Sequence, residues 1–476
     1  MAEGLQYPGD YLIEKLELVT SAGVVVDLRS LYMGLTLYED IFSLTVTGTL
    51  TIHDSTNLTS LGPIIGQEYL YIKIRTPFDN TDGSTIIDFS ENAFIVHSVV
   101  KREAVGENIQ MIALSFVSQE LIKNQRLKVT QSFTGSWSDI VEKVMTDSNI
   151  LNSKKDITIE PSAGIKKYVS PNIRPLDIVT HAKKQAVSEF KGEPTYLFYE
   201  TLKGFNFRTL ASLYNDPIQL TYSAMTPGFN YNDGILDIMK EISNIIEFNI
   251  VANNDNIVNY RTGVYGSKLI THDIIGKTYT TKVYNYLDNF ENEHHIVGGV
   301  NQGNQEFPLA SKILVTEEGK RVSDFSGRTF MAPTSLGNGG ADSQHQTKNN
   351  TSPYMASDPQ KWLQRRNSQM IQLENALNVN LEVWGNTLIT VGNKVEINLP
   401  YMAAVESPDG TKTDKFYRGP FLIKKIRHDF TPASSPPKHK MYLSLVKDSL
   451  EEELSDAGPI EPAAKSKKVQ SQEYLT

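Results

Sequence analysis

The same succession of alternating polar and apolar segments occurs near both ends of this chain. Residues 113–121 read ALSFVSQEL and residues 442–450 read YLSLVKDSL, so four of nine aligned positions are identical. Alternation with a period of two is typical of β-strands that bury one face. The repeat restricts the fold, because two sets of strands with the same inward-facing pattern need two similar apolar interiors.

Three further pairs of segments precede these two in the same order. They are AFIVHSVVK at 93–101 with PFLIKKIRH at 420–428, GQEYLYIKI at 66–74 with GNKVEINL at 392–399, and LTVTGTLTI at 44–52 with NVNLEVWG at 378–385. The intervals agree: 28 positions separate Gly66 from Phe94, and 29 separate Gly392 from Phe421. Alternation makes single strands look alike, but it does not reproduce four strands in one order at matching intervals. We therefore predict one β-domain that occurs twice.

The predicted fold class is β-rich α+β, with two homologous tube-type β-barrel domains, inserted α/β modules and a disordered C-terminal tail. A chain of 476 residues is long enough for three or four domains. The predicted domains are a first barrel at 1–125, an inserted α/β domain at 126–230, a second barrel formed by 231–275 with 366–450, an insertion with a long flexible loop at 276–365, and the tail at 451–476.

Two helices are predicted in the inserted α/β domain. In 132–150, Ser136 or Ser138 suits an N-cap before apolar residues at helical spacing. In 170–190, Pro175 suits the first helical turn. A separate module of helices and strands is expected here.

Two stretches read as irregular. Residues 299–360 are loose, and 335–352 consists largely of Gly, Asn, Ser and Gln. That stretch lacks the glycine motifs that cradle phosphates, so a flexible or partner-ordered loop is favoured over a nucleotide site. The tail at 451–476 is interpreted either as a solvated end or as a segment that orders against a neighbouring subunit or a partner protein.

Composition excludes several classes of function. A net charge of −9 argues against nucleic acid as a tightly held ligand, because phosphate binding needs a basic surface. The absence of cysteine rules out disulfides and thiolate metal sites, and it suits assembly in a reducing cytoplasm. The N-terminal residues do not resemble a signal peptide, and no apolar run is long enough for a membrane span, so a soluble protein is expected.

The segment FENEHHIVGG at 290–299 holds the densest group of titratable residues, namely Glu291, Glu293, His294 and His295. Neighbouring residues on a strand face opposite sides, so His294 and His295 would reach one ion only if the backbone turned. Ordinary loop histidines are favoured over a metal site, and no cofactor is expected.

Catalytic motifs do not stand out in the sequence. No nucleophile elbow occurs, and no pair of carboxylates is singled out. The sequon Asn57-Leu58-Thr59 is expected to be a chance match. We therefore predict no catalytic, cofactor-binding or metal-binding residues and no enzyme activity.

A duplicated domain has a specific use in a symmetric assembly. Closed homo-oligomers obey rotational symmetry. A trimer of a chain with two similar domains presents six similar units around one axis. Such a ring can match a six-fold partner on one face and a three-fold partner on the other.

The sequence resembles the central baseplate hub protein of contractile-tailed phages of the T-even type and the hub portion of the type VI secretion valine-glycine-repeat spike proteins. The resemblance covers most of residues 5–450. It is carried by packing patterns: MIALSFVSQEL, MYLSLVKDSL, PFLIKKIRHDF, the phrase G-x-x-V-x-I-x-L-P at 392–400 and the helix PLDIVTHAKKQA at 175–186.

The resemblance implies a homotrimeric torus whose six barrels continue a hexameric tail tube, with a trimeric cell-puncturing spike on the opposite side. Other baseplate proteins and a tape measure protein are further implied partners. The expected location is the virion baseplate, after assembly in the host bacterial cytoplasm. Since the chain ends soon after the second barrel, a phage hub with a separately encoded spike is favoured. DNA would only pass through the channel, so we expect a pore wall that is neutral or acidic.

The alternative is a tail-associated β-rich hydrolase or glycan-binding module. A pocket with perturbed carboxylates would favour that alternative, and a trimer with an axial channel would favour the hub.

Overall fold

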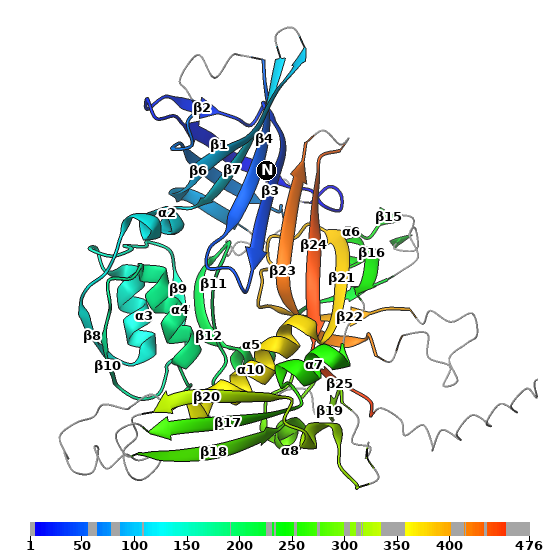
Figure 1. Ribbon diagram of the computed structural model, residues 1–476. Helices are drawn as coiled ribbons and strands as arrows, with labels where there is room; N and C mark the ends of the chain where they lie inside the picture. The colour runs from blue at the N-terminus through cyan, green and yellow to red at the C-terminus, as the bar shows by residue number, and fades with distance from the viewer. Residues whose placement is uncertain are drawn as a thin grey trace, which may run out of the picture.

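The computed structural model describes residues 5–55, 64–77, 86–106, 109–190, 192–224, 231–232, 235–251, 255–273, 277–298, 305–310, 316, 318–334, 358–400, 414, 416–432 and 436–453. Strands dominate the structure, and 13 of them form one large, mainly antiparallel sheet (Figure 1). The predicted β-rich α+β class is confirmed.

The first seven strands form one half of the large sheet. They are β1 (Leu12–Val19), β2 (Val25–Asp27), β3 (Tyr32–Asp40), β4 (Thr47–Asp54), β5 (Tyr69–Arg75), β6 (Ile86–Gly106) and β7 (Ile109–Ser118). Their hydrogen-bonding order is β3-β4-β7-β6-β5-β1-β2. Alternate residues, among them Leu35, Leu50 and Leu114, point into one apolar cluster. These strands therefore curl around a core of their own.

Six strands from the later part of the chain form the other half. They are β13 (Ile218–Ser223), β16 (Ile245–Val251), β21 (Leu377–Trp384), β22 (Lys394–Asn398), β23 (Gly419–Thr431) and β24 (Lys438–Lys447). They pair in the order β16-β21-β24-β23-β22-β13, which matches β3-β4-β7-β6-β5-β1 strand for strand. They also enclose an apolar cluster of their own, with Leu381, Val395 and Leu443. The halves differ at one end, where β13 runs parallel to β22 but β1 runs antiparallel to β5.

Two register shifts fall at equivalent places in the two halves, although β6 has further shifts after Val99 and after Ala104 that β23 lacks. β3 and β16 each shift register against the next strand at the same step, after Tyr32 and after Ile245. β6 and β23 do the same against β7 and β24, after Val96 and after Ile423. A β-bulge inserts an extra residue at a defined position in a ladder. Matching bulges therefore set a residue-by-residue equivalence between the halves.

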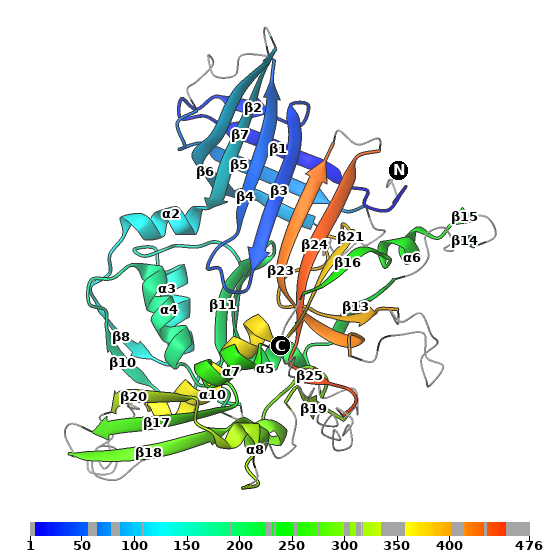
Figure 2. The same ribbon diagram turned by 45° about the vertical axis from the view of Figure 1, so that its right-hand side comes forward.

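One strand pair joins the halves into a continuous sheet. β3 pairs antiparallel with β23, from Leu35 opposite Phe430 to Asp40 opposite Lys425, and Figure 2 shows the two strands side by side. The cores also interlock, because Phe430 of β23 packs into the first core and Ile41, just after β3, packs into the second. We call this junction the seam.

A module of helices and short strands is inserted after β7. It contains α2 (Gln119–Arg126), β8 (Ser132–Gly135), α3 (Trp137–Thr146), β9 (Ile157–Ile159), β10 (Lys166–Val169), α4 (Pro175–Gln185), β11 (Tyr196–Thr201), β12 (Gly204–Thr209) and α5 (Leu210–Asn215). Ser136 is the N-cap of α3, since its hydroxyl accepts the Asp139 N–H, and Pro175 opens α4 as predicted. The module has its own core, built around Trp137 and Phe198.

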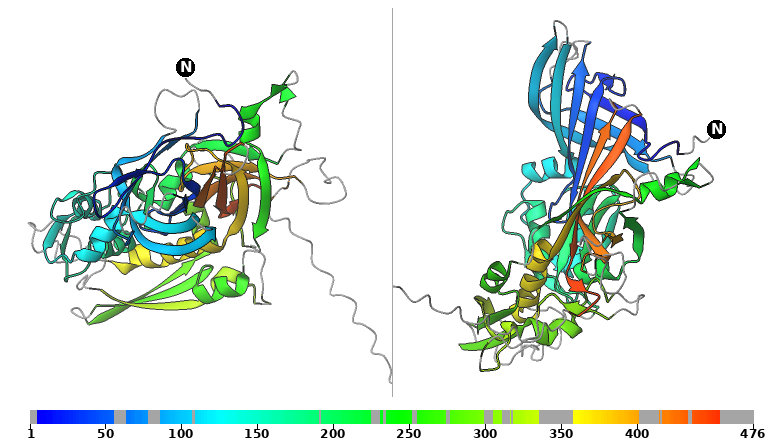
Figure 3. Two further views of the ribbon diagram at one scale, coloured as in Figure 1. Left: turned by 90° about the horizontal axis from the view of Figure 1, so that it is seen from above. Right: turned by 90° about the vertical axis from the view of Figure 1, so that its right-hand side faces the viewer.

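A second insertion forms a small sheet far from the first half of the large sheet (Figures 1 and 3). Its strands β17 (Gly266–Asp273), β18 (Thr278–Asn285) and β20 (Arg328–Thr334) pair in the order β18-β17-β20, and α10 (Pro359–Asn375) packs against them. Shorter elements are β14 (Tyr231–Asn232), β15 (Ile235–Leu236), α6 (Ile238–Ile242), α7 (Asn256–Thr262), α8 (Tyr286–Asn289), η1 (Phe290–Asn292), β19 (Phe307–Pro308), η2 (Val322–Asp324) and β25 (Ser449–Leu450).

Several strands depart from the sequence-based assignments. β19 and β20 lie in the stretch 299–360 that was predicted to be loose, so that prediction is wrong there. β13 falls in the range assigned to the inserted α/β domain but pairs with β22, and β17 falls in the range assigned to the second barrel but pairs with β18 and β20. Strand patterns are local and do not specify a partner, which is why the boundaries shifted. Residues 335–357, the sequon at 57–59 and the tail beyond residue 453 lie outside the described residues.

Candidate functional site

A continuous polar face crosses the seam on the large sheet. One row of directly opposite residues runs through seven strands, from β21 across β24, β23, β3, β4 and β7 to β6; in that order it is Trp384, Lys440, Asp429, Thr36, Thr49, Ser115 and Ser98. Residues that alternate with this row, such as Leu37 and Leu50, are buried in the cores. Because side chains in paired strands share a face at opposite positions, the row and its neighbours form one surface.

The charges on this polar face balance. On its charged part the cations are Lys425, Arg427, Lys438 and Lys440, and the carboxylates are Asp40, Asp429, Glu247 and Glu382. Three cations are ion-paired: Lys425 to Asp40 at 2.9 Å, Arg427 to Asp429 at 2.8 Å, and Lys440 to Glu382 at 2.6 Å. The fourth, Lys438, lies over the ring of Trp384 at 5.5 Å. The described part of this face therefore carries no belt of unpaired positive charge.

Several strand edges of the large sheet are open within the described part of the chain, and two of them, on β16 and β6, flank the polar face. β16 pairs only with β21, and β6 pairs only with β7 from Ser98 onward. Large apolar side chains are exposed along both edges: Ile246 on β16, and Val99 and Val100 on β6, which are 36% and 63% exposed. An open edge with exposed apolar side chains is a template for pairing with another strand.

A hollow beside the β16 edge reaches across the next two strands. Its volume is about 340 Å³, and it is lined by Glu247, Phe248, Asn249, Asn380, Leu381, Glu382, Tyr442, Leu443 and Ser444. The open edge is therefore bordered by a recess that side chains of another molecule could fill.

Three buried titratable side chains, Glu39, His428 and His439, form a chain of hydrogen bonds at the seam, which we call the relay. His428 Nε2 lies 3.3 Å from Glu39 Oε1, and His428 Nδ1 lies 3.1 Å from His439 Nε2. The second oxygen of Glu39 accepts the N–H of Val391 at 3.1 Å. All three titratable side chains are essentially inaccessible to solvent. Burial, and then the neighbouring His428, lower the pKa of His439 well below its ordinary value of 6.5.

This relay predicts an acid-sensitive seam. The folded chain keeps His439 neutral, whereas the unfolded chain takes up a proton as the pH falls below 6.5, so stability is lost in that range. The expected loss from this group is up to about 1.4 kcal/mol of unfolding free energy per pH unit. The measurement is urea unfolding of the wild type and of His439→Gln between pH 7.5 and 5.5. The wild type should lose more stability than the variant, and parallel curves would contradict the prediction.

His295 provides a contrast of opposite sign. Burial alone would lower the pKa of His295, but Asp448, 2.9 Å away, and nearby glutamates outweigh it and raise the pKa. A raised pKa stabilises the fold below pH 6.5, and this contribution is lost as the pH rises through the folded value. The stability advantage of the wild type over His295→Gln should therefore grow as the pH falls, whereas its advantage over His439→Gln should shrink.

The residues singled out at 290–299 serve the fold. Glu293 is buried and pairs with Arg365 at 3.2 Å, whereas Glu291 is exposed. The ring of His295 stacks on Phe290 with centroids 3.8 Å apart. The described residues contain no group of three or more metal-ligating side chains. Residues 290–298 form no strand: they begin with η1 and continue as irregular backbone.

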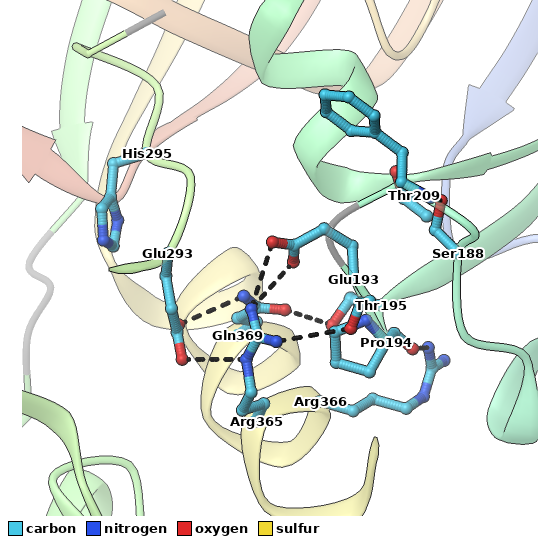
Figure 4. A network of polar contacts seen from close by, with 12 residues as sticks. Ser188, Glu193, Pro194, Thr195, Thr209, Glu293, His295, Arg365, Arg366 and Gln369 are labelled. Atoms are coloured by element: carbon cyan, nitrogen blue, oxygen red, sulfur yellow. Dashed lines mark hydrogen bonds and ion pairs between the residues drawn. The ribbon is translucent and has the colours of Figure 1, made fainter. Parts of the chain in front are cut away.

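Sequence reasoning missed the centre of this network, Arg365 of α10. Figure 4 shows Glu193 and Glu293 on either side of its guanidinium. Arg365 Nη2 lies 3.1 Å from Glu193, and the neighbouring Arg366 donates to the carbonyl of Tyr196 at 2.9 Å. The motif WLQRRNSQ showed two adjacent arginines, but no local signal indicated carboxylate partners more than 70 residues away.

A groove of about 520 Å³ lies on the inserted module. It is lined by Ser138, Asp139, Glu142, Thr146, Lys155, Asp156, Ile157, Ile159 and Pro161. Asp139 accepts the Ser136 N–H at 2.9 Å in the cap of α3, and the Lys155 ammonium is held by two buried glutamates. These two polar residues are thus engaged by the fold.

In the part of the chain that the structure describes, no helix is long and apolar enough to cross a membrane.

Comparison with known proteins supports a resemblance to phage tail proteins. The chain is 20% identical over 285 residues to the probable baseplate hub protein of Vibrio phage KVP40, and the match covers 59% of this chain and 64% of that protein, which is less than two thirds of its length. No protein-family profile matches the chain.

Solved structures that match this chain include two tail proteins and a component of a type VI secretion system. A tail protein from Neisseria meningitidis MC58 matches with a TM-score of 0.47 and 11% identity, covering 92% of this chain and 97% of that one. The 43 kDa tail protein of prophage MuSo2 from Shewanella oneidensis has a TM-score of 0.47 and 9% identity, covering 91% and 98%. The c3393 protein of E. coli, a component of a type VI secretion system, has a TM-score of 0.39 and 7% identity, covering 92% and 76%. The predicted resemblance to a phage baseplate hub protein is supported by the relative from Vibrio phage KVP40.

Proposed function

We propose that this protein is the structural hub of a contractile phage-tail baseplate, where it assembles as a homotrimer and joins a hexameric tail tube to a trimeric spike. The single observation that carries the proposal is the repeat of six strands in the same hydrogen-bonding order within one chain. Three such chains present six similar units, which is the property an adaptor between three-fold and six-fold partners needs. The similarity to a phage hub protein supports the baseplate as its location.

The contact between neighbouring subunits follows from the seam within each chain. At the seam, the outer edge of β3 pairs with β23. The strand equivalent to β3 is β16, and the strand equivalent to β23 is β6, and both of these edges are open in the described chain. We infer that β16 of one subunit pairs with β6 of the next, which repeats the seam between subunits and closes a ring.

The equivalence predicts the register of this contact. Thr36 faces Asp429 at the seam. Through the pairing of β3 with β4 and of β16 with β21, Thr36 corresponds to Asn249, and through β7 and β24, Asp429 corresponds to Glu103. Asn249 of one subunit should therefore lie opposite Glu103 of the next.

Engineered disulfides test the proposal, since the chain has no cysteine of its own. In the doubly substituted chain Asn249→Cys with Glu103→Cys, mild oxidation should link chains into covalent dimers and trimers on a denaturing gel. The two positions stand seven strands apart in the sheet of one chain, roughly 34 Å along the sheet at the usual spacing, and the mass of the product on the gel separates a link between chains from one within a chain.

A mismatched pair serves as the control. Asn249→Cys with Val25→Cys, which joins β16 to the other end of the sheet, should stay uncrosslinked. Equal crosslinking of both pairs, or of neither, would reject the proposed ring contact.

The polar face is proposed to line the channel through which DNA passes. Its cations are ion-paired or lie over an aromatic ring, so they offer little attraction to phosphate, and a conduit should let DNA slide rather than hold it. Assembly in the host cytoplasm is part of the same proposal. Electron micrographs of the purified ring should show pseudo-six-fold symmetry with a central opening.

A further inference from the structure

A lysine and two glutamates are enclosed together where the inserted module meets the first half of the sheet. Lys155 precedes β9, Glu120 lies on α2 and Glu200 lies on β11. The Lys155 Nζ is 2.8 Å from Glu120 Oε2 and 2.6 Å from Glu200 Oε1. The Lys155 side chain is 5% exposed and both carboxyl groups are fully buried. The rings of Phe89 and Phe205 flank the ammonium at 5.4 and 5.6 Å.

The two oxygens of the Glu200 carboxyl group have different hydrogen-bond partners. Its Oε2 accepts the backbone N–H of Val46 at 2.8 Å and the hydroxyl of Ser118 at 2.6 Å, while its Oε1 faces Lys155. Two fixed donors on one oxygen stabilise negative charge that develops there, as in the oxyanion hole of acyl-transfer enzymes. Oε2 is therefore the oxygen on which negative charge can develop, and the Lys155 amine lies next to Oε1 of the same carboxyl group.

Glu120 is placed to move protons. Its Oε2 accepts from Lys155, and its Oε1 accepts the hydroxyl of Ser153 at 2.8 Å.

A buried group with one cation and two carboxylates has an excess negative charge, and burial disfavours that charge. Burial, with a contribution from Glu120, raises the pKa of Glu200 despite the opposing effect of Lys155. Burial alone would lower the pKa of Lys155, but the two carboxylates raise it. One carboxyl proton would offset the excess negative charge of this group, and the raised pKa of Glu200 favours that residue as its holder.

We propose that Lys155 and Glu200 join in an intramolecular isopeptide bond after the chain has folded, with Glu120 as the catalytic acid and base. Glu120 takes a proton from the Lys155 ammonium, and the free amine attacks the Glu200 carbon. The former carbonyl oxygen, Oε2, takes up negative charge under the Val46 and Ser118 donors. Glu120 then passes its proton to Oε1, the carbon–oxygen bond breaks, and one water molecule leaves as the amide forms.

The reaction needs no other reactant and is independent of the proposed function. Amine and carboxylic acid become amide and water, and the second amine proton returns to Glu120 and then to solvent. The bond ties the loop before β9 to β11, positions 45 residues apart. It would also replace a buried ion pair, which adds little net stability, by a covalent link within the inserted module.

Intact mass spectrometry of the folded and then denatured protein tests the proposal. The wild-type mass is expected to fall below the sequence mass by one water molecule, with the fraction rising during incubation of the folded protein. Fragmentation should find a branched peptide that links Lys155 to Glu200. A wild-type protein that keeps its full sequence mass after prolonged incubation would overturn the proposal and leave a plain buried ion pair.

Two variants separate chemistry from folding. Glu120→Gln keeps the shape and an acceptor for Lys155 but cannot shuttle the proton, so the variant should fold and keep its own full sequence mass. Glu68→Gln alters another fully buried glutamate, one that accepts the N–H of Gly66, and should still lose one water. A water loss that persists in folded Glu120→Gln would reject the catalytic role, and the branched peptide in the wild type remains decisive if that variant does not fold.

Discussion

Replacing Val99 and Val100 by aspartate is expected to abolish trimer formation while the monomer keeps its fold. Both side chains are exposed on the open edge of β6, at 36% and 63%, where the neighbouring β16 is proposed to pair. Each buried, unpaired carboxylate would cost several kcal/mol, and every 1.4 kcal/mol weakens association about tenfold. The expected loss of association is therefore at least roughly thousandfold for each subunit contact.

The opposite end of the sheet supplies a matched control. Val24 and Val25, at the start of β2, are two adjacent valines of similar exposure, 38% and 59%. Val24→Asp with Val25→Asp should leave the trimer intact. Sedimentation velocity at several concentrations measures all three proteins, and circular dichroism checks their folds. Equal loss of assembly in both variants, or a wild type that stays monomeric throughout, would contradict the prediction.

Replacing Arg365 by methionine is expected to remove about 3–5 kcal/mol of unfolding free energy, because Glu193 and Glu293 would be left buried without their cation. The methionine fills most of the volume of the arginine stem, so the loss reports mainly on charge. Urea unfolding at pH 7.5 measures it. Arg29→Met, which removes an exposed ion pair with Asp27, should lose far less, because solvent screens that pair.

The loss in Arg365→Met should shrink as the pH falls. Burial raises the pKa of Glu293, and the positive charge of Arg365 opposes this increase. Without Arg365 the pKa of Glu293 should therefore rise further. A carboxyl group with a raised folded pKa binds protons more tightly in the folded chain, and stability relative to the wild type recovers towards acid pH. A stability difference that stayed constant from pH 7.5 to 5.5 would show that packing, rather than charge, is lost.

Local features were predicted well where a local rule decides the structure. The N-cap at Ser136 and the helix start at Pro175 follow from hydrogen-bonding and backbone geometry within a few residues, and both are present. The strands β21 to β24 also appear close to their predicted ranges, since alternation marks which residues face a core. The domain boundaries at 230 and 275 have no such local rule, and β13 and β17 pair with strands outside the domains assigned to them.

Polar side chains in the interior were the least predictable part. Glu293 and His295 stood out as a possible metal group, yet their partners Arg365 and Asp448 come from elements far along the chain. Lys155 attracted no attention in the sequence, although it lies between two buried carboxyl groups. Whether a titratable residue is exposed, paired or reactive depends on these long-range contacts, and spacing in the sequence does not record them.

The sequence by itself determined that one strand pattern occurs twice. The alternation of polar and apolar residues along each strand shows which side chains face inward and which face outward. Only the tertiary structure decided that β3 meets β23 and leaves the equivalent edges of β16 and β6 open. It alone also enclosed Lys155 with Glu120 and Glu200. The physical reason is that alternation follows from backbone geometry over neighbouring residues, whereas edge pairing and buried charge partners follow from how distant segments share the same space.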